Sequence, residues 1–306
     1  MFEPDTATGV ATEGELRRFF PLAQEGAQVR AVVTWVREGG LADLDGLTPR
    51  SLVILASDRL SAAAADLVIS HYPAAPFPTV VTGALPPYVG ALDIVVVIGS
   101  DLEQQWTTEA ISTAVNVGAV TITVGYPDEL LSDAHLQPPD IPFAPGYSLA
   151  KQCACIAAAL SGPGEHTAVM LDELARELDE EIAAVHPSRG AEVNPARHLA
   201  EQYQYRPIVH AGPAPLTRLI AEQWLRSGWV SAVMPARLIR DRLAAPEVEW
   251  TVIDWDAHGQ EGITEVVDSD AASDLARALR YYVRAAAAPM METEEQSVME
   301  SEEWKD

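Results

Sequence analysis

The stretch Leu92–Glu109, LDIVVVIGSDLEQQWTTE, decides the fold of this chain. Its first part, Leu92 to Ile98, is an apolar run broken by one aspartate, typical of a parallel strand buried on both faces. A short polar loop follows at Gly99 to Glu103, and Thr107 opens a segment with helical spacing. Strand, loop and helix in this order place a ligand at the helix start, where free backbone N–H groups favour an anion.

Some side chains of this segment favour the binding of an anion, and others oppose it. Ser100, Thr107 and Thr108 carry hydroxyl groups that could help to hold a phosphate. Asp101 and Glu103 are carboxylates that would repel one. The position therefore predicts a ligand crevice, and the side chains leave the kind of ligand open.

Length and charge set further bounds. The chain has 306 residues, 45 of them Asp or Glu against 20 Lys or Arg, which gives a formal charge of −25. Nucleic acid is not expected as a partner, because phosphate backbones require a basic surface. The same charge argues against anionic membranes, and no apolar run has the length of a membrane span. The acidity is interpreted as an aid to solubility.

Two cysteines, Cys153 and Cys155, lie two residues apart in a predicted helix. At that spacing they point to different faces, so neither a shared metal nor a disulfide between them is expected. They are interpreted as small buried side chains of a reduced protein. Met1–Asp5 does not begin like a signal peptide. A cytoplasmic location is expected.

The pattern alternates strands and helices over the first half of the chain, which predicts a doubly wound α/β domain at 25–162 after a lead-in at 1–24. The strands are expected at 51–56, 79–81, 94–98 and 119–124, and the helices at 24–37, 61–70, 107–117 and 148–160.

The second half has the same pattern on a smaller scale. A helical linker at 163–193, with an acidic helix at 168–185, precedes a second α/β domain at 194–290. Its strands are expected at 207–210, 229–233 and 248–253, and its helices at 217–226, 237–243 and 271–288. The acidic residues 291–306 are expected to be disordered.

The order of these segments resembles the sugar isomerase (SIS) domain proteins. The resemblance rests on the first strand, on Leu85–Val89 ahead of the next strand, on Ile94–Thr108, on Pro142–Leu160, and on Asn194–Arg197 at the opening of the second half. Within these proteins the chain is most similar to the bifunctional phosphoglucose/phosphomannose isomerases and their divergent TobH-like branch. The resemblance implies two three-layer α/β/α sandwiches with mainly parallel sheets, and a homodimer.

The residues that carry catalysis in this family are replaced here. The glycine-rich first loop reads Ser57–Ser61 without glycine, and the Ser-x-Ser-Gly-Asn-Thr phosphate loop reads Gly99–Glu103. The arginine expected after a proline is missing at Pro145–Tyr147, and the Asn-Glu and His-Asn contexts of the base and the ring-opening histidine are absent. Isomerisation needs a base and an electrophile for the enediolate. An active isomerase is therefore not expected.

Candidate site residues follow from position and chemistry. The ligand-binding candidates are Ser57, Gly99, Ser100, Thr107 and Thr108, all next to the carboxyl ends of predicted strands or at a helix start.

No residue is assigned as catalytic with certainty, and the weak candidates are His210, at a strand end, and Glu222, on a helix. A structural histidine and a solvated glutamate are the favoured interpretations of these two. His166, His186 and His198 lack metal-ligand spacing, so neither a metal nor a cofactor is expected.

Three functions stay open at this point. The favoured one is a non-catalytic or strongly diverged protein that binds a sugar phosphate or related metabolite in carbohydrate metabolism. The second is an active phosphosugar isomerase converting glucose or mannose 6-phosphate to fructose 6-phosphate, with Ser100 and Thr108 holding the phosphate and His210 or Glu222 as base. The third is a structural dimer without a ligand. A shared fold alone does not distinguish them.

Overall fold

In the computed structural model, the chain divides into two compact units. One comprises Gln24–Glu177 with Ala271–Ala276, and the other comprises the described residues of Met1–Ala23, Leu178–Asp270 and Arg277–Asp306. The structure describes residues 11–100, 105–125, 136–141, 147–204, 206–233, 251–255, 264–265, 271 and 273–291. The predicted helix at 237–243 and the acidic tail after Met291 lie outside these residues.

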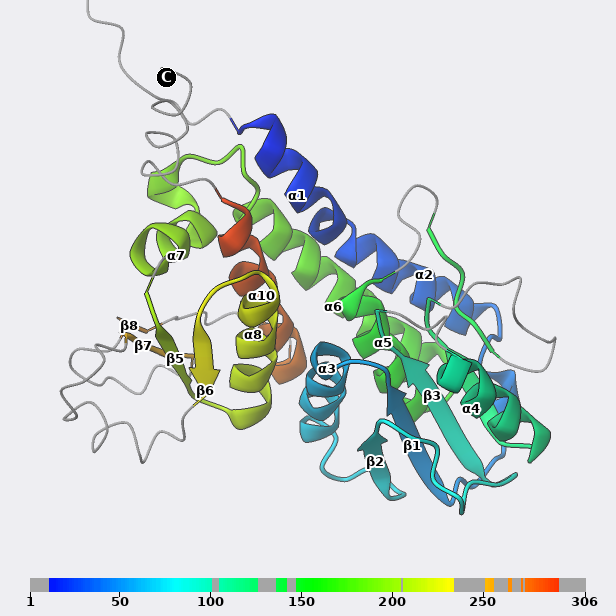
Figure 1. Cartoon of the computed structure of the whole chain (residues 1–306). Helices are drawn as coiled ribbons and strands as arrows, with labels where there is room; N and C mark the ends of the chain where they lie inside the picture. Colours follow the sequence, from blue (N-terminus) through cyan, green and yellow to red (C-terminus); the bar gives the residue numbers. More distant parts are fainter. Residues whose placement is uncertain are drawn as a thin grey trace, which may run out of the picture. The chain divides into compact units, whose positions relative to one another are not determined.

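The first unit is built on a parallel sheet with the strand order β2-β1-β3-β4. Its strands and helices alternate as the sequence predicts (Figure 1). They are α2 (Glu25–Arg37), η1 (Ala42–Leu44), β1 (Ser51–Ala56), α3 (Arg59–Ser70), β2 (Thr79–Thr82), β3 (Asp93–Ile98), α4 (Gln105–Asn116), β4 (Val120–Thr123), α5 (Leu149–Ser161) and the first part of α6 (Glu165–Ala184).

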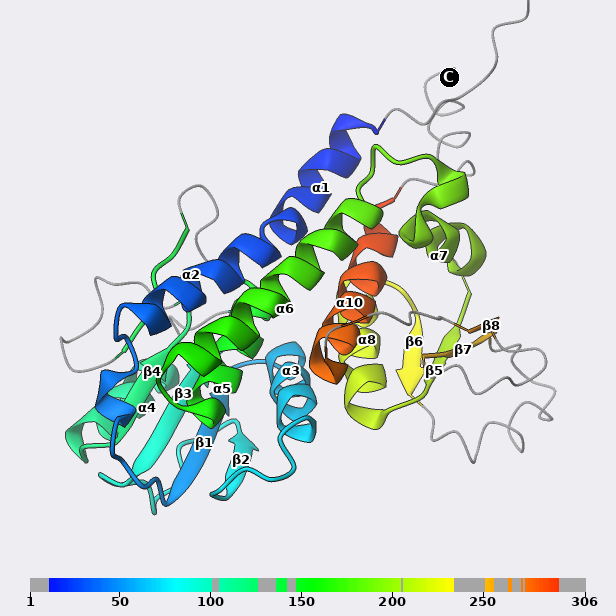
Figure 2. The ribbon, with the colours of Figure 1, turned by 180° about the vertical axis from the view of Figure 1, so that it is seen from behind.

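Two apolar strands form the centre of this unit, because every residue of β1 and β3 is buried. Val53, Leu55, Val95 and Val97 point to one face and form a core cluster with Ala110 and other residues of α4. The alternate residues point to the opposite face, as the pleat requires. Figure 2 shows α2 and α5 on that side of the sheet. The sheet thus lies between two helical layers, which confirms the predicted α/β class.

The second unit contains a smaller parallel sheet with the order β6-β5-β7-β8. The side chain of Trp224 on α8 donates to the carbonyl of Ala285 on α10 (2.7 Å), which joins these two helices. The elements are α1 (Glu13–Ala23), the last part of α6, η3 (Ala191–Val193), α7 (Pro195–Tyr203), β5 (Ile208–Ala211), α8 (Ala214–Arg226), β6 (Ser231–Val233), β7 (Thr251–Asp254), β8 (Thr264–Glu265), α10 (Asp274–Ala287) and η4 (Ala288–Met290).

Buried ion pairs hold helices together within the second unit. Glu181 on α6 is fully buried and accepts from Arg284 on α10 at 2.8 and 3.0 Å, with Arg280 at 3.4 Å. Arg197 on α7 pairs with buried Glu15 on α1 at 2.9 Å. The helix that the sequence predicted as a linker, α6, therefore carries a buried carboxylate, Glu181, that the arginines of α10 must neutralise. An unpaired buried carboxylate is strongly destabilising.

Candidate functional site

The sheet of the first unit reverses its direction of winding between β1 and β3. The chain passes from β1 to β2 on one side and from β3 to β4 on the other, so the two central strands mark a topological switch point. Ala56 and Ile98, the last residues of these strands, lie opposite each other in the register. Ligands of open parallel sheets bind in the crevice outside such a pair of strand ends.

Three of the predicted ligand residues are brought together at this edge. The backbone N–H of Ser57 donates to the carbonyl of Ile98 (2.9 Å), so Ser57 lies next to the start of the Gly99–Ser100 loop. The hydroxyl oxygen of Ser57 is buried and has no hydrogen-bond partner among the residues that the structure describes. The edge therefore offers a polar atom that its described surroundings do not satisfy.

The other two predicted residues lie in the first turn of α4. Thr107 is fully buried, and its hydroxyl oxygen also has no partner within the described part of the chain. Thr108 is half-buried. The intervening residues 101–104, which include the two acidic residues of the loop, lie outside the described residues. The assignment of Thr107 and Thr108 to the ligand site therefore stays a prediction.

Asp58 also lies at this edge of the sheet, and it was not among the residues predicted from the sequence. It caps the N-terminus of α3, where its Oδ1 accepts from the Ser61 N–H (3.0 Å) and its Oδ2 from the Ser61 hydroxyl (2.9 Å). The same Oδ2 also accepts from the N–H of Ser100 across the strand ends (2.8 Å). Burial raises the pKa of Asp58, but the bonds from Ser61 and Ser100 outweigh it and hold the pKa below its ordinary value. Asp58 is a carboxylate at neutral pH.

Gln152 on α5 was also missed. Its side chain is 1% exposed, and its Nε2 donates to the carbonyl of Gly99 (3.3 Å). Because a carbonyl only accepts, the amide nitrogen must face Gly99, and the amide oxygen points elsewhere. That oxygen is buried with no hydrogen-bond partner among the described residues. A polar side chain inside the Ala-rich sequence of α5 was the one signal in the sequence.

The start of α5 is satisfied from within the protein. Buried Glu25 on α2 accepts from the Ser148 hydroxyl (2.5 Å) and from the N–H groups of Leu149 (3.3 Å) and Ala150 (2.8 Å). Burial raises the pKa of Glu25 to about 6, and these hydrogen bonds limit the rise. Buried Lys151 is bound to Asp140 (2.5 Å). We interpret this cluster as structural.

His210, the sequence's acid–base candidate, lies in the core of the other unit. It is fully buried against the rings of Trp224 and Trp255. Its Nδ1 accepts from the Trp255 indole N–H (3.0 Å), so the proton resides on Nε2, which lies 2.7 Å from the Ser231 hydroxyl. Burial lowers the pKa of His210 to about 3. The geometry favours the structural interpretation, while Glu222 is half-buried on α8.

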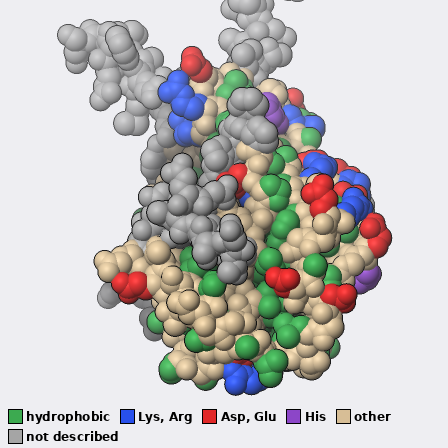
Figure 3. All heavy atoms as spheres, turned by 90° about the vertical axis from the view of Figure 1, so that its right-hand side faces the viewer, with side chains coloured by type: hydrophobic (Ala, Val, Ile, Leu, Met, Phe, Trp, Pro, Cys, Tyr) green, Lys and Arg blue, Asp and Glu red, His purple; other side chains and the backbone are tan. Residues whose placement is uncertain are grey.

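The cysteines, the possible metal ligands and the charged surface can be described for the same part of the chain. Cys153 and Cys155 are buried free thiols, and burial raises the pKa of both. Among the described residues no group of His, Cys, Asp and Glu could hold a metal ion, and no helix could span a membrane. On the face seen in Figure 3, basic side chains lie scattered beside acidic ones.

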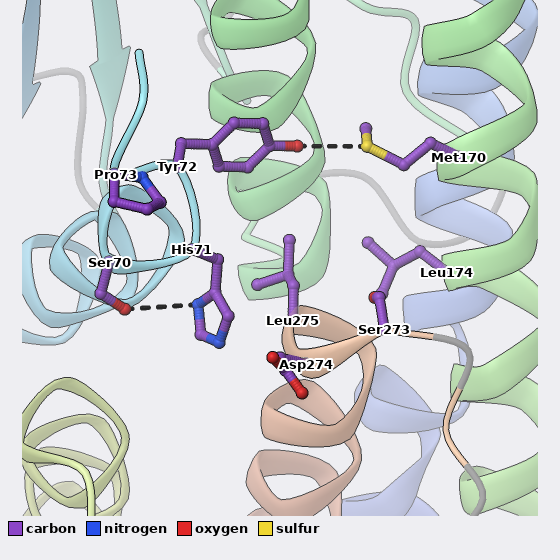
Figure 4. A pocket seen from close by; sticks show the side chains of 9 residues that line it. All are labelled: Ser70, His71, Tyr72, Pro73, Met170, Leu174, Ser273, Asp274 and Leu275. Carbon is purple, nitrogen blue, oxygen red and sulfur yellow. Dashed lines mark hydrogen bonds between the residues drawn. The ribbon is translucent and has the colours of Figure 1, made fainter.

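A hollow in the first unit lies apart from the candidate residues at the strand ends. It has a volume of about 480 Å³ and is lined by nine residues, among them His71 after α3, Met170 on α6 and Asp274 at the start of α10. Tyr72 donates to the sulfur of Met170 (3.1 Å), and the Nδ1 of His71 lies 3.3 Å from the Ser70 hydroxyl (Figure 4). The same Nδ1 lies 2.8 Å from the Leu67 carbonyl. Because Tyr72 and His71 are hydrogen-bonded within the protein, the hollow is a weaker candidate for a ligand site than the strand ends are.

Comparison with known proteins identifies the fold of this chain through solved structures and not through its sequence. No model of a protein family and no curated protein matches the sequence. Among solved structures, a candidate sugar-binding protein from Salmonella typhimurium LT2 is 15% identical over 89% of this chain and 99% of its own, with a TM-score of 0.62. Tagatose-6-phosphate ketose/aldose isomerase from Escherichia coli is 15% identical over 97% and 96%, with a TM-score of 0.60.

The C-terminal domain of glucosamine-fructose-6-phosphate aminotransferase from Francisella tularensis is 12% identical, covers 93% of this chain and 96% of its own, and has a TM-score of 0.59. These matches confirm the SIS-type fold that the sequence predicted. At such identities, a fold by itself does not assign a reaction.

Proposed function

We propose that this chain binds a sugar phosphate or a related small carbohydrate metabolite at the carboxyl ends of β1 and β3, and that it does not isomerise its ligand. The observation that carries the proposal is a pair of buried polar atoms, the Ser57 hydroxyl and the Gln152 amide oxygen, that have no hydrogen-bond partner in the part of the chain that the structure describes. Buried polar atoms nearly always have a partner, and hydroxyl-rich ligands supply one. Structural neighbours whose names refer to sugars or sugar phosphates support the same class of ligand.

The lack of turnover is argued from the acid–base groups. An isomerase needs a base that reaches the proton between two neighbouring carbons. His210 is enclosed by Trp224, Trp255 and Ser231 and has both ring nitrogens engaged. With a pKa of about 3 it would also be a weak base. The homodimer and the cytoplasmic location stay predictions of the sequence.

The test combines binding with turnover. Thermal shifts are measured with fructose, mannose and glucosamine and with their 6-phosphates, beside a coupled assay for conversion of glucose or mannose 6-phosphate to fructose 6-phosphate. The proposal expects a rise in melting temperature with at least one ligand, and no turnover. Turnover that His210→Ala abolishes would favour the isomerase instead, and no response to any ligand would favour a structural protein.

A variant locates the site. Gln152→Leu removes the buried amide oxygen and should abolish the ligand-induced shift. Gln223→Leu makes the same change on α8, in the other unit, and should leave the shift intact. Equal shifts in both variants would mean that the ligand binds elsewhere.

A further inference from the structure

Two backbone N–H groups at the ends of β1 and β3 already bind a carboxylate. The start of α3 and the loop after β3 supply the N–H groups of Ser61 and Ser100, and Asp58 accepts from both, at 3.0 and 2.8 Å. The hydroxyl of Ser61 adds a third bond to the same side chain (2.9 Å). A phosphate would need such donors at a helix start and would meet a like charge instead.

Among the described residues, the buried amide oxygen of Gln152 has no hydrogen-bond partner, and it requires a donor rather than an acceptor. The amide oxygen of Gln152, on a side chain that is 1% exposed, can only accept a hydrogen bond. The Nε2 of the same side chain donates to the carbonyl of Gly99. Gly99 is followed by Ser100, whose N–H donates to Asp58. A phosphate dianion brings acceptors alone, whereas a sugar hydroxyl both donates and accepts. The buried serine hydroxyl at Ser57 suits a hydroxyl partner equally well.

We infer that Asp58 is an internal anion at the ends of β1 and β3 that occupies the N–H groups of Ser61 and Ser100 and repels a phosphate, so that this site selects unphosphorylated, hydroxyl-rich carbohydrates over their phosphates. The sugar part of this inference rests on the proposed function and narrows its ligand. The claim that Asp58 occupies these N–H groups does not depend on the proposed function, because inorganic phosphate, without any sugar, tests whether they can bind another anion. Asp58 is thereby a specificity-determining residue.

The test uses inorganic phosphate as the first probe. Asp58→Ser removes the charge and opens the space, while a serine still caps α3. Phosphate binding is measured by calorimetry at constant ionic strength, and Asp58→Ser should bind phosphate at least about tenfold more tightly than the unaltered protein. Asp43→Ser, at an exposed carboxylate in η1, changes the net charge equally and should behave like the unaltered protein.

The second probe is a set of matched sugars with and without a 6-phosphate. The unaltered protein should show the larger melting-temperature rise with the free sugar, and Asp58→Ser should shift this preference toward the phosphate. Equal phosphate affinity in Asp58→Ser and the unaltered protein would overturn the inference, as would tighter binding of sugar phosphates by the unaltered protein. If Asp58→Ser gains phosphate binding while no sugar binds either protein, the role of Asp58 holds and the proposed function fails.

Discussion

Replacement of His210 by asparagine should remove a pH dependence from the stability of the protein. The imidazole is buried and neutral, with its pKa lowered to about 3 by burial. In the unfolded chain the pKa returns to its ordinary value of 6.5. Below pH 6.5 the unfolded state binds a proton that the folded state does not, so folding loses free energy as the pH falls.

The magnitude follows from the two pKa values. Each pH unit between them costs about 1.4 kcal/mol, so acidification from pH 7.5 to 4.5 should cost the unaltered protein about 2.7 kcal/mol through His210. At pH 7.5, His210→Asn should itself cost about 3 kcal/mol, because the Ser231 hydroxyl loses its buried partner and packing against Trp224 is lost. The two effects oppose each other, so the difference between the proteins should nearly vanish at pH 4.5.

The assay is urea unfolding followed by tryptophan fluorescence at pH 4.5, 5.5, 6.5 and 7.5. Trp224 and Trp255 lie against the histidine and report directly on this core. A free-energy difference that stays constant across the four pH values would refute the reasoning, because it would mean that His210 titrates equally in both states.

Other ionisable groups give further predictions. Burial raises the folded pKa of Glu25 to about 6, above its ordinary value of 4.5, so its contribution to stability should fall by about 1.5 kcal/mol as pH rises from 4.5 to 6.5. Urea unfolding should show this fall in the unaltered protein and not in Glu25→Gln, and a free-energy difference between them that does not change with pH would count against it. Glu181→Gln should cost about 3–5 kcal/mol in the same assay, since it leaves Arg284 without its buried carboxylate. The control Glu180→Gln, at an exposed neighbour, should stay within about 0.5 kcal/mol, and similar losses in both would contradict the role of Glu181.

The sheet of the first unit was predictable because its central strands contain the apolar runs 52–56 and 94–98. The strand at 51–56 has the predicted bounds, and that at 94–98 gains only Asp93. Helix α1 was missed, and Pro21 in its interior obscures the helical pattern. The signal for α7 was present, since Asn194 caps the helix and Pro195 opens it, but it had been interpreted only as the start of a domain.

The sequence predicts where the candidate site lies but not which groups meet there. Their position after buried strands predicts that Ser57 and Ser100 lie at one edge of the sheet, where the structure places them, and their part in binding a ligand stays a prediction. The roles of Asp58 and Gln152 depend on contacts across 42 and 53 residues of sequence, and no local pattern encodes those. An aspartate three residues before Ser61 signals a helix cap, but only the fold shows that the same carboxylate also takes the Ser100 N–H.

The most direct test of a binding site without turnover is proton NMR of the sugars and their 6-phosphates with the protein in D₂O. Isomerisation passes through an enediolate, so an active enzyme would replace the C2 proton of the aldose by deuterium even without net conversion. The account predicts that the sugar signals broaden or show saturation transfer from the protein, which reports binding. It also predicts that the C2 proton signal keeps the same intensity over time as in a sample without protein. Loss of that signal in the presence of the protein would contradict the account.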